Sequence, residues 1–496
     1  MNAWTTGRRR LVAVLVVALV VAVGVGTALL GRTSSPPPSG PAGHGALEIN
    51  VTGPFATLAP TFWGINVVPQ SAPSTSMTRA VESSPVAFVR YPGGLVGERL
   101  NLSSNVLVND VGSGYTPPFG LAEFVPWCRS IHCRAVLELP AEIDDPASAA
   151  FQVHYTESVL GFRPDFWEIG NEPATWNHFG IPWSRWNASQ HLNATPGEFA
   201  TLVGAYARAV HAIDPAARLI GLGGVGTGAS NELAWLRAVA GADGAELSGL
   251  AIHVYPASTG ATTGTGGLAD FLGTLEGGAS LPARFVADQR AVQSACPACS
   301  NLSLWVTELG SANASAPFAP GLLNGSVQAV YIAAEIVQAV ELGVPQVDEF
   351  ALASATWSSW FDATGSPRPV GSLYTGVLGA LGTGVYPTHF TGDLGGVYAA
   401  ALSTPTGGGV AVLIVNANAS SALDLSLVVP GLRWSPEAFL LPWNSSAAAP
   451  ANATRGVPDH VVIPAASILL VDDPGATPAL FLDGPLFAPP SGTMPR

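Results

Sequence analysis

Trp167-Glu168-Ile169-Gly170-Asn171-Glu172-Pro173 is an apolar run that stops abruptly at polar residues. The run predicts a strand, and the glycine and proline predict its end. A strand that ends this way delivers its last side chains, Asn171 and Glu172, into a cleft. A second run of the same kind ends at Glu308, within Leu304-Trp305-Val306-Thr307-Glu308-Leu309-Gly310. Two carboxylates therefore follow two predicted strands.

Short apolar runs alternate with longer Ala- and Leu-rich stretches from about residue 61 to residue 382. Eight runs predict strands, and three of the stretches repeat apolar residues at helical spacing. The predicted strands are 62–68, 86–91, 134–139, 166–171, 218–222, 249–255, 302–308 and 346–354, and the helices are 197–213, 231–240 and 326–342. Eight such alternations predict a (β/α)8 TIM barrel over residues 61–382. An open doubly wound sheet is the alternative, but residues 221–224 lack the spacing of its phosphate-binding turn.

After residue 382 the pattern changes to short alternating strands without helical periodicity. Strands are predicted at 397–402, 410–416, 423–429, 438–442 and 467–471. This pattern predicts a C-terminal antiparallel β-sandwich over residues 383–473. We expect a strand within residues 46–60 to complete the sandwich, and residues 474–496 to form a flexible tail.

The N-terminus has the pattern of a targeting segment. Three arginines at 8–10 precede an apolar run over residues 11–30, which as a helix would span roughly 30 Å. We therefore expect residues 1–32 to be a transmembrane anchor or a signal sequence, followed by a Pro/Gly-rich linker over 33–45. The anchor would leave the rest of the chain at the cell surface, and cleavage would secrete it.

Two further features are typical of export. Ten Asn-x-Ser/Thr sequons predict a glycoprotein. They begin at Asn50, Asn101, Asn187, Asn193, Asn301, Asn313, Asn324, Asn418, Asn444 and Asn452. The four cysteines form two local pairs, Cys128 with Cys133 and Cys296 with Cys299, which outside the cell predict two disulfides. A structural zinc site with four thiolates is the alternative.

The charge balance excludes one class of partner. The chain has no lysine, a net charge of −14 and only 11% charged residues. Nucleic acid would require a basic face, so we expect no nucleic-acid binding. The lack of a basic cluster also argues against a groove for long sulfated glycans.

The two predicted strand-end carboxylates suit glycoside cleavage. A retaining glycosidase needs one carboxylic acid to protonate the leaving oxygen and one carboxylate to attack the anomeric carbon. We assign Glu172 as acid/base and Glu308 as nucleophile, with Asn171 holding a substrate hydroxyl. Protein carboxylates perform both steps, so we expect no metal and no organic cofactor. Either glutamate alone could instead cap a helix or pair with an arginine.

The segment around Glu172 resembles the fourth-strand motif of clan A retaining glycoside hydrolases. Within the clan it is most similar to the heparanase/β-glucuronidase family (glycoside hydrolase family 79) and next to the α-L-arabinofuranosidases. The resemblance covers the barrel and the sandwich. It implies that Glu172 is the acid/base and that Glu308, on the seventh strand, is the nucleophile.

Two other segments resemble the same clan. Val89-Arg90-Tyr91-Pro92-Gly93-Gly94 is similar to its second-strand turn, which implies that Arg90 orients the nucleophile. His253-Val254-Tyr255-Pro256 is similar to the end of its sixth strand, which implies a hydrogen bond from Tyr255 to the nucleophile. His253 is two residues from Tyr255 and so faces the same side of the strand.

Tryptophans near the strand ends are candidate sugar contacts. Trp176 lies in an aromatic-rich loop that either builds leaving-group subsites or folds on its own hydrophobic cluster. We expect Trp357, beyond the eighth strand, to lie beneath the reacting sugar. The chain departs from its relatives at Leu95-Val96-Gly97-Glu98, where they have a turn led by Asn or Ser. This departure affects the expected contacts to the sugar.

These patterns together predict a retaining O-glycoside hydrolase that cleaves extracellular oligo- or polysaccharides by double displacement. The alternative is a non-catalytic cell-surface protein that binds glycans on a glycosidase scaffold. The intact pair of Glu172 and Glu308 favours the enzyme.

Overall fold

The structure is a computed structural model. It describes residues 40–49, 56–108, 113–178, 195–226, 231–259, 267–299, 302–311, 318, 322, 325–355, 358–391, 394–405, 409–428, 437–442, 451–455 and 460–472.

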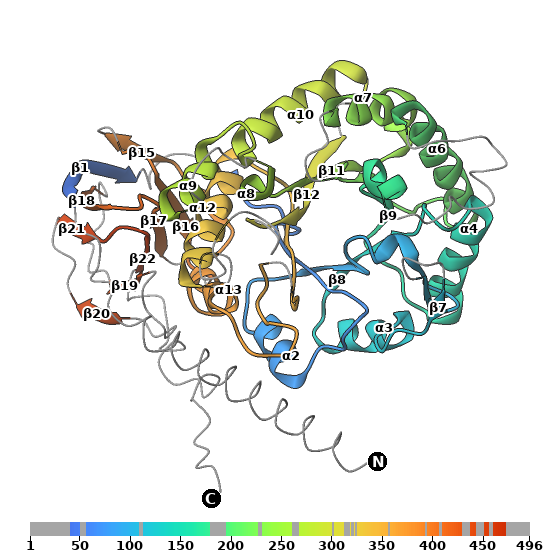
Figure 1. Cartoon of the computed structure of the whole chain (residues 1–496), viewed down its shortest axis with the longest axis horizontal. Helices are drawn as coiled ribbons and strands as arrows, with labels where there is room; N and C mark the ends of the chain where they lie inside the picture. Colours follow the sequence, from blue (N-terminus) through green and yellow to red (C-terminus); the bar gives the residue numbers. More distant parts are fainter. Residues whose placement is uncertain are drawn as a thin grey trace, which may run out of the picture.

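Eight parallel strands close into a barrel in the order β3-β4-β8-β9-β10-β11-β12-β13 (Figure 1). They are Trp63–Asn66 (β3), Phe88–Tyr91 (β4), Arg134–Leu139 (β8), Phe166–Asn171 (β9), Leu219–Gly223 (β10), Gly249–Val254 (β11), Ser303–Leu309 (β12) and Val347–Glu349 (β13). Each overlaps one of the predicted strands, so the predicted TIM barrel is confirmed. The runs are almost entirely buried, as expected for parallel strands covered by helices.

Helices surround the barrel (Figure 1). They are Thr75–Glu82 (α2), Leu121–Ser130 (α3), Pro146–His154 (α4), Pro196–Ile213 (α6), Glu232–Asp243 (α7), Pro256–Thr259 (α8), Leu268–Gly273 (α9), Leu281–Ala295 (α10), Ser326–Leu342 (α12) and Pro369–Ser372 (α13). Local signals set their ends. The Thr195 side chain caps α6 by accepting from the Glu198 N–H, and Pro196 occupies its first position. Gly343 ends α12 in a left-handed conformation, with φ of 65°.

Two further sheets form the sandwich beside the barrel (Figure 1). The four-stranded sheet has the order β15-β1-β18-β21 and the seven-stranded sheet the order β2-β14-β16-β17-β22-β19-β20. The strands are Gly40–Ile49 (β1), Ala56–Thr57 (β2), Gly384–Tyr386 (β14), Thr388–Thr391 (β15), Val397–Ser403 (β16), Val410–Asn416 (β17), Ser421–Val428 (β18), Glu437–Pro442 (β19), Ala451–Arg455 (β20), His460–Ile463 (β21) and Ser467–Asp472 (β22). β1 begins within the segment for which we expected a linker, and it pairs with both β15 and β18.

In the seven-stranded sheet, β17 is buried on both faces. On β17, Val412 and Ile414 pack against the four-stranded sheet in one core. The alternate residues Leu413 and Val415 belong to the main core, which includes α12. Successive side chains of a strand point to opposite faces, so this strand attaches the sandwich to the barrel.

A short insertion follows β4. It contains the 3-10 helix Gly97–Arg99 (η1) and a three-stranded sheet of Leu100–Asn101 (β5), Val106–Val108 (β6) and Gly114–Tyr115 (β7). Residues 109–112 of this insertion lie outside the described residues.

Both predicted cysteine pairs form disulfides. Cys128 is bonded to Cys133, between the end of α3 and the start of β8. Cys296 is bonded to Cys299, just after α10. The zinc alternative is therefore excluded, because all four thiols are used.

The prediction of an N-terminal membrane anchor, and with it of a cell-surface location and a membrane partner, requires correction. In the part of the chain that the structure describes, no helix combines the length and the apolar character needed to cross a bilayer. The apolar run over residues 11–30 itself lies outside that part.

The double burial of β17 predicts a large cost for truncating Leu413. Leu413→Ala should lower the free energy of unfolding by about 2–5 kcal/mol, because it removes a fully buried side chain between sheet and helix. Val462→Ala, on the outer strand β21 with Val462 65% exposed, is the control and should change little. Urea unfolding of both variants makes the measurement. Equal losses would contradict the packing described.

Candidate active site

The carboxyl ends of the barrel strands surround a cleft of about 430 Å³. Its described lining residues are Val68, Gln70, Ser71, Gly93, Gly94, Leu95, Val96, Asn171, Glu172, Glu308, Phe350, Ala353, Ser354, Ala355 and Ala363. β9 delivers Asn171 and Glu172 to it, and β12 delivers Glu308. The two predicted strand-end carboxylates therefore meet in one cleft.

Arg90, on β4, lies fully buried beneath this cleft. Its Nε donates to Glu168 on β9. Nη1 donates to Oε1 of Glu308 at 2.9 Å and to Oδ1 of Asn66 at 3.0 Å. Nη2 donates to Oδ1 of Asn171 at 2.8 Å. One guanidinium thus connects the ends of β3, β9 and β12.

The charges around Arg90 keep it protonated. Burial alone would lower the pKa of Arg90, but the carboxylates of Glu168, Glu138 and Glu308 raise it above its ordinary value. Glu138 lies 3.2 Å from the guanidinium and is itself fully buried. Burial raises the pKa of Glu138 well above its ordinary value, against the effect of Arg90.

Glu308 is held by groups that favour its charged form. Arg90 donates to one carboxylate oxygen, and the Tyr255 hydroxyl donates to the other at 2.7 Å. Burial leaves the pKa of Glu308 above its ordinary value, and the neighbouring Glu172 adds to this rise, whereas Arg90 and the Tyr255 hydrogen bond limit it. A carboxylate fixed in this way is suited to attack carbon.

Glu172 has a different environment. Its backbone has a φ of 45°, in the left-handed region that a residue with a side chain rarely occupies. Its N–H donates to the Gly223 carbonyl at 3.0 Å. Burial raises the pKa of Glu172 to about 7, although Arg90 and Arg284 lower it. Its carboxyl is therefore protonated in mildly acidic solution.

His253 lies between the two carboxyls. Its Nδ1 is 2.9 Å from Oε1 of Glu172 and 3.5 Å from Oε2 of Glu308. Burial lowers the pKa of His253 to about 4, so the ring is neutral at neutral pH. It therefore acts as a hydrogen-bonding partner and not as a cation.

Glu172, His253 and Glu308 could in principle hold a metal ion. One ligand atom from each lies within 4.8 Å of the others. The charged Arg90, bonded to Glu308, opposes a second cation beside the same carboxylate. The arrangement suits proton transfer between neutral and charged groups better than metal binding.

Of the two tryptophans predicted to contact the sugar, the structure describes Trp176. Trp176, in the 3-10 helix Pro173–His178 (η3), is almost fully buried and donates from Nε1 to the Asn171 carbonyl at 2.8 Å. Its ring packs edge-on against Phe199. It therefore holds the Asn171 backbone and, being buried, is not a sugar platform. Trp357 lies outside the described residues.

The Gly93-Gly94 turn allows close packing at the cleft. A Cβ on Gly93 would lie 2.4 Å from Oδ1 of Asn66. Gly94 has a φ of 79°, and a Cβ there would lie 3.0 Å from the ring of Phe350. Glycine is therefore required at both positions.

The sequence interpretation did not identify Asn66 or Glu98 as site residues. Asn66 ends β3 and donates from Nδ2 to the Thr307 carbonyl at 2.9 Å, next to Glu308. Its position at the end of a predicted barrel strand could have indicated a role in the site, because active sites of such barrels form at the strand ends. The only sequence signal for Glu98 was that the turn containing it differs from the corresponding turn in the related enzymes.

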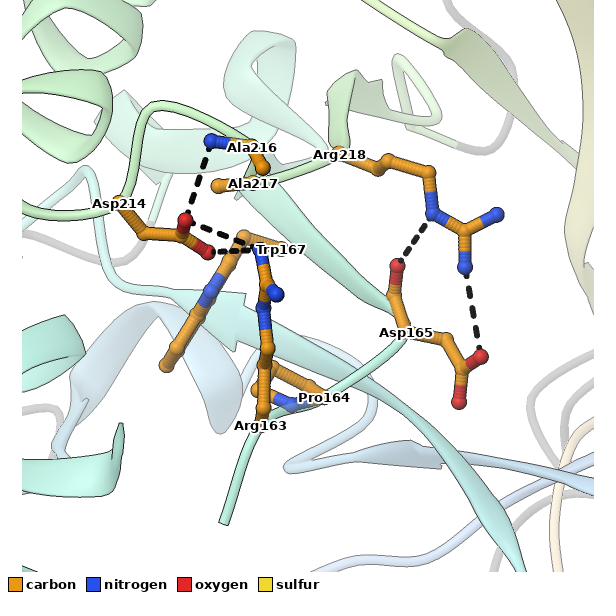
Figure 2. Close-up of a pocket in the computed structure, with 8 residues that line it drawn as sticks. All are labelled: Arg163, Pro164, Asp165, Trp167, Asp214, Ala216, Ala217 and Arg218. Atoms are coloured by element: carbon orange, nitrogen blue, oxygen red, sulfur yellow. Dashed lines mark hydrogen bonds and ion pairs between the residues drawn. The ribbon is translucent and has the colours of Figure 1, made fainter. Parts of the chain in front are cut away.

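A second hollow, of about 350 Å³, lies at the opposite end of β9 and β10 (Figure 2). Its charged residues are paired with one another: Arg163 with Asp214 at 2.6 Å, and Arg218 with Asp165 at 3.3 Å. These pairs leave no described charge free for a ligand. This end of the barrel therefore has a structural role.

Solved structures share this fold. A GH51 arabinofuranosidase from Xanthomonas axonopodis pv. citri matches with a TM-score of 0.67 at 16% identity, over 86% of this chain and 99% of its own. AbfB, a family 51 α-L-arabinofuranosidase from Bifidobacterium longum, matches with a TM-score of 0.66 at 17% identity, over 88% and 100%. A family 44 xyloglucanase from Paenibacillus polymyxa matches with a TM-score of 0.64 at 12% identity, over 87% and 99%.

At such identities these matches establish the fold. They agree with the resemblance to clan A glycoside hydrolases and, within it, with the α-L-arabinofuranosidases that the sequence placed second. Neither the protein-family models nor the curated proteins gave a match.

Arg90→Leu should lower the free energy of unfolding by about 3–5 kcal/mol, because it leaves buried carboxylates without their cation. Arg163→Leu is the control. The side chain of Arg163 is 56% exposed in its pair with Asp214, so its loss should cost less than about 1 kcal/mol. Urea unfolding at neutral pH measures both. A loss for Arg90→Leu no larger than the control would contradict the central role of this guanidinium.

Proposed function

We propose that the protein is a retaining glycoside hydrolase in which Glu172 is the acid/base and Glu308 the nucleophile. The observation that carries the proposal is the closeness of the two carboxyls, because one oxygen of Glu172 lies within 4.8 Å of one oxygen of Glu308. Retaining enzymes hold their carboxyls about 5–5.5 Å apart, whereas inverting enzymes need roughly 6.5–9.5 Å to admit a water. The short separation supports a retaining mechanism, in which the Glu308 carboxylate attacks the anomeric carbon directly.

The first step uses the contrast between the two carboxyls. Glu308, ionised beside Arg90, attacks the anomeric carbon and forms a bond to it. Glu172, protonated below about pH 7, gives its proton to the departing glycosidic oxygen. The product of this step is a covalent glycosyl-enzyme and a free leaving group.

The second step releases the sugar. Glu172, now ionised, removes a proton from a water molecule, whose oxygen attacks the anomeric carbon. The bond to Glu308 breaks and the carboxylate is restored, with the original anomeric configuration retained. His253 stays within hydrogen-bond distance of Glu172 and can accommodate either protonation state.

Asn171 supplies a donor for the substrate. Its Oδ1 is used by Arg90, while its buried Nδ2 has no hydrogen-bond partner among the described residues. Asn171 lines the cleft beside Glu172. A sugar hydroxyl next to the anomeric carbon would satisfy this amide, and such a bond strengthens in the transition state.

The cleft supports a neutral sugar. Among the described residues that line it, Glu172 and Glu308 are the charged ones. A uronic acid would need a cationic partner, which these residues do not supply. Two of the structures with this fold are named as arabinofuranosidases. We therefore take an α-L-arabinofuranoside of an oligo- or polysaccharide as the first substrate to test.

Turnover of aryl glycosides tests this proposal. The purified protein should hydrolyse an aryl α-L-arabinofuranoside in preference to the β-glucuronide, β-glucoside and β-xyloside. Glu308→Gln should lower kcat by about three orders of magnitude or more, because the nucleophile is lost. Glu335→Gln changes a fully buried carboxyl on α12 that is not among the described lining residues of the cleft, and it is the matched control. Binding of glycans without turnover of any glycoside would instead support a non-catalytic glycan-binding protein.

The pH dependence should follow Glu172. Its carboxyl must be protonated to act as the acid, so kcat/KM should fall as pH rises through about 7. In Glu172→Gln, assayed beside the wild type on an aryl glycoside whose leaving group still benefits from the proton, this alkaline decline should disappear. Rates measured from about pH 4 to about pH 9 make the comparison. An alkaline decline that persists in Glu172→Gln would assign it to another group.

A further inference from the structure

The turn after Gly93-Gly94 carries a buried carboxylate that the steps above do not use. Glu98 lies in η1, just beyond the cleft-lining residues Leu95 and Val96, and has no solvent exposure. An isolated buried carboxylate is costly unless hydrogen bonds compensate it. Its partners therefore indicate what it does.

Three backbone N–H groups converge on Glu98. Its Oε2 accepts from Ala141 and from Glu142, each at 2.7 Å. Its Oε1 accepts from Asn171. The first two donors belong to the loop after β8, and the third is the last residue of β9. One side chain on the loop after β4 thus joins the ends of two neighbouring strands.

Two glycines allow this carboxylate to lie so close. A Cβ on Gly97 would lie 2.2 Å from the carboxylate of Glu138, so η1 packs directly on β8. Gly170 has a φ of 74°, and a Cβ there would lie 3.3 Å from Oε1 of Glu98. The backbone on both sides is therefore shaped to receive the carboxylate.

The donor set favours a carboxylate over a carboxamide. Two oxygens accept three N–H bonds, which a carboxamide cannot do because one of its two positions is itself a donor. Burial raises the pKa of Glu98 to about 8, while the N–H bonds from Glu142, Ala141 and Asn171 lower it. The hydrogen bonds thus offset part of the cost of burial.

The peptide groups of Asn171 are held on both sides. Its N–H donates to Glu98, and its carbonyl accepts from Trp176. The next residue, Glu172, has the sparsely populated φ of 45°, which persists only where the surroundings restrain it. The direction of the Glu172 carboxyl, toward His253, therefore depends on these restraints.

We propose that Glu98 is a positioning residue that sets the placement of Asn171 and Glu172 through the backbone, without touching the substrate. This inference rests on the function proposed above. Misplacing a general acid by about 1 Å can cost about a hundredfold in rate. The cost falls on reactions whose leaving group needs a proton.

The test compares two substrates of one enzyme. One is an aryl α-L-arabinofuranoside with an activated leaving group, and the other an arabino-oligosaccharide. Glu98→Gln should lower kcat/KM, which reports the first step, by about 10–100-fold on the oligosaccharide and by at least about tenfold less on the activated glycoside. Glu335→Gln, a loss of a buried carboxylate elsewhere, should leave both rates unchanged. Equal losses on the two substrates, or no loss, would overturn the proposal.

A second measurement does not depend on turnover. The crystal structure of Glu98→Gln should show the Asn171–Glu172 peptide displaced from Gly223 and His253 relative to the wild-type crystal structure. An undisplaced peptide would overturn the positioning role. If the wild-type protein cleaves neither substrate, the proposed function fails, and this displacement still decides the role of Glu98. If Glu98→Gln does not fold, Glu98→Asp keeps the charge with a shorter reach and takes its place in both measurements.

Discussion

A single buried cation organises the carboxyl end of this barrel. Arg90 contacts acidic or amide oxygens from β3, β8, β9 and β12, and all of these groups are buried. The carboxylates need the guanidinium to remain charged, and the guanidinium needs them for the same reason. This mutual dependence fixes strands that are far apart in the sequence at one point. The side chains that these strands present to the cleft are therefore held at their inner ends by one shared contact.

The two glutamates of the cleft acquire different chemistry from their neighbours. Both are buried, and burial raises the pKa of both. Glu308 has a permanent cation and a hydroxyl donor beside it, whereas the hydrogen-bonding partner of Glu172 is His253, which burial keeps neutral. Burial thus favours the neutral form of both carboxyls, and direct hydrogen bonds from Arg90 and Tyr255 oppose it at Glu308. The two glutamates therefore differ in protonation because their hydrogen-bonding partners differ, although the residue type is the same.

Much of the fold could be predicted because periodicity is local. All eight barrel strands and the helices α6, α7 and α12 follow from apolar spacing, and the ends of β9 and β12 place Glu172 and Glu308. The role of Glu98 could not be predicted, because its donors lie 43, 44 and 73 residues away. Trp176 resembled a sugar platform in sequence, but its indole N–H meets a buried carbonyl. The N-terminal apolar run suggested an anchor, which required correction.

The pairing of β1 has a consequence for synthesis of the chain. β1 is the first strand that the structure describes, yet it pairs with β15 and β18, with Leu47 opposite Phe390 and Leu427. β3 likewise waits for β13 before the barrel closes. As the polypeptide leaves the ribosome, β1 lacks both of its partners, and β3 lacks one of its two, until most of the protein has been translated. Such long-range pairing slows folding and leaves early apolar segments exposed, a situation in which nascent chains rely on chaperones.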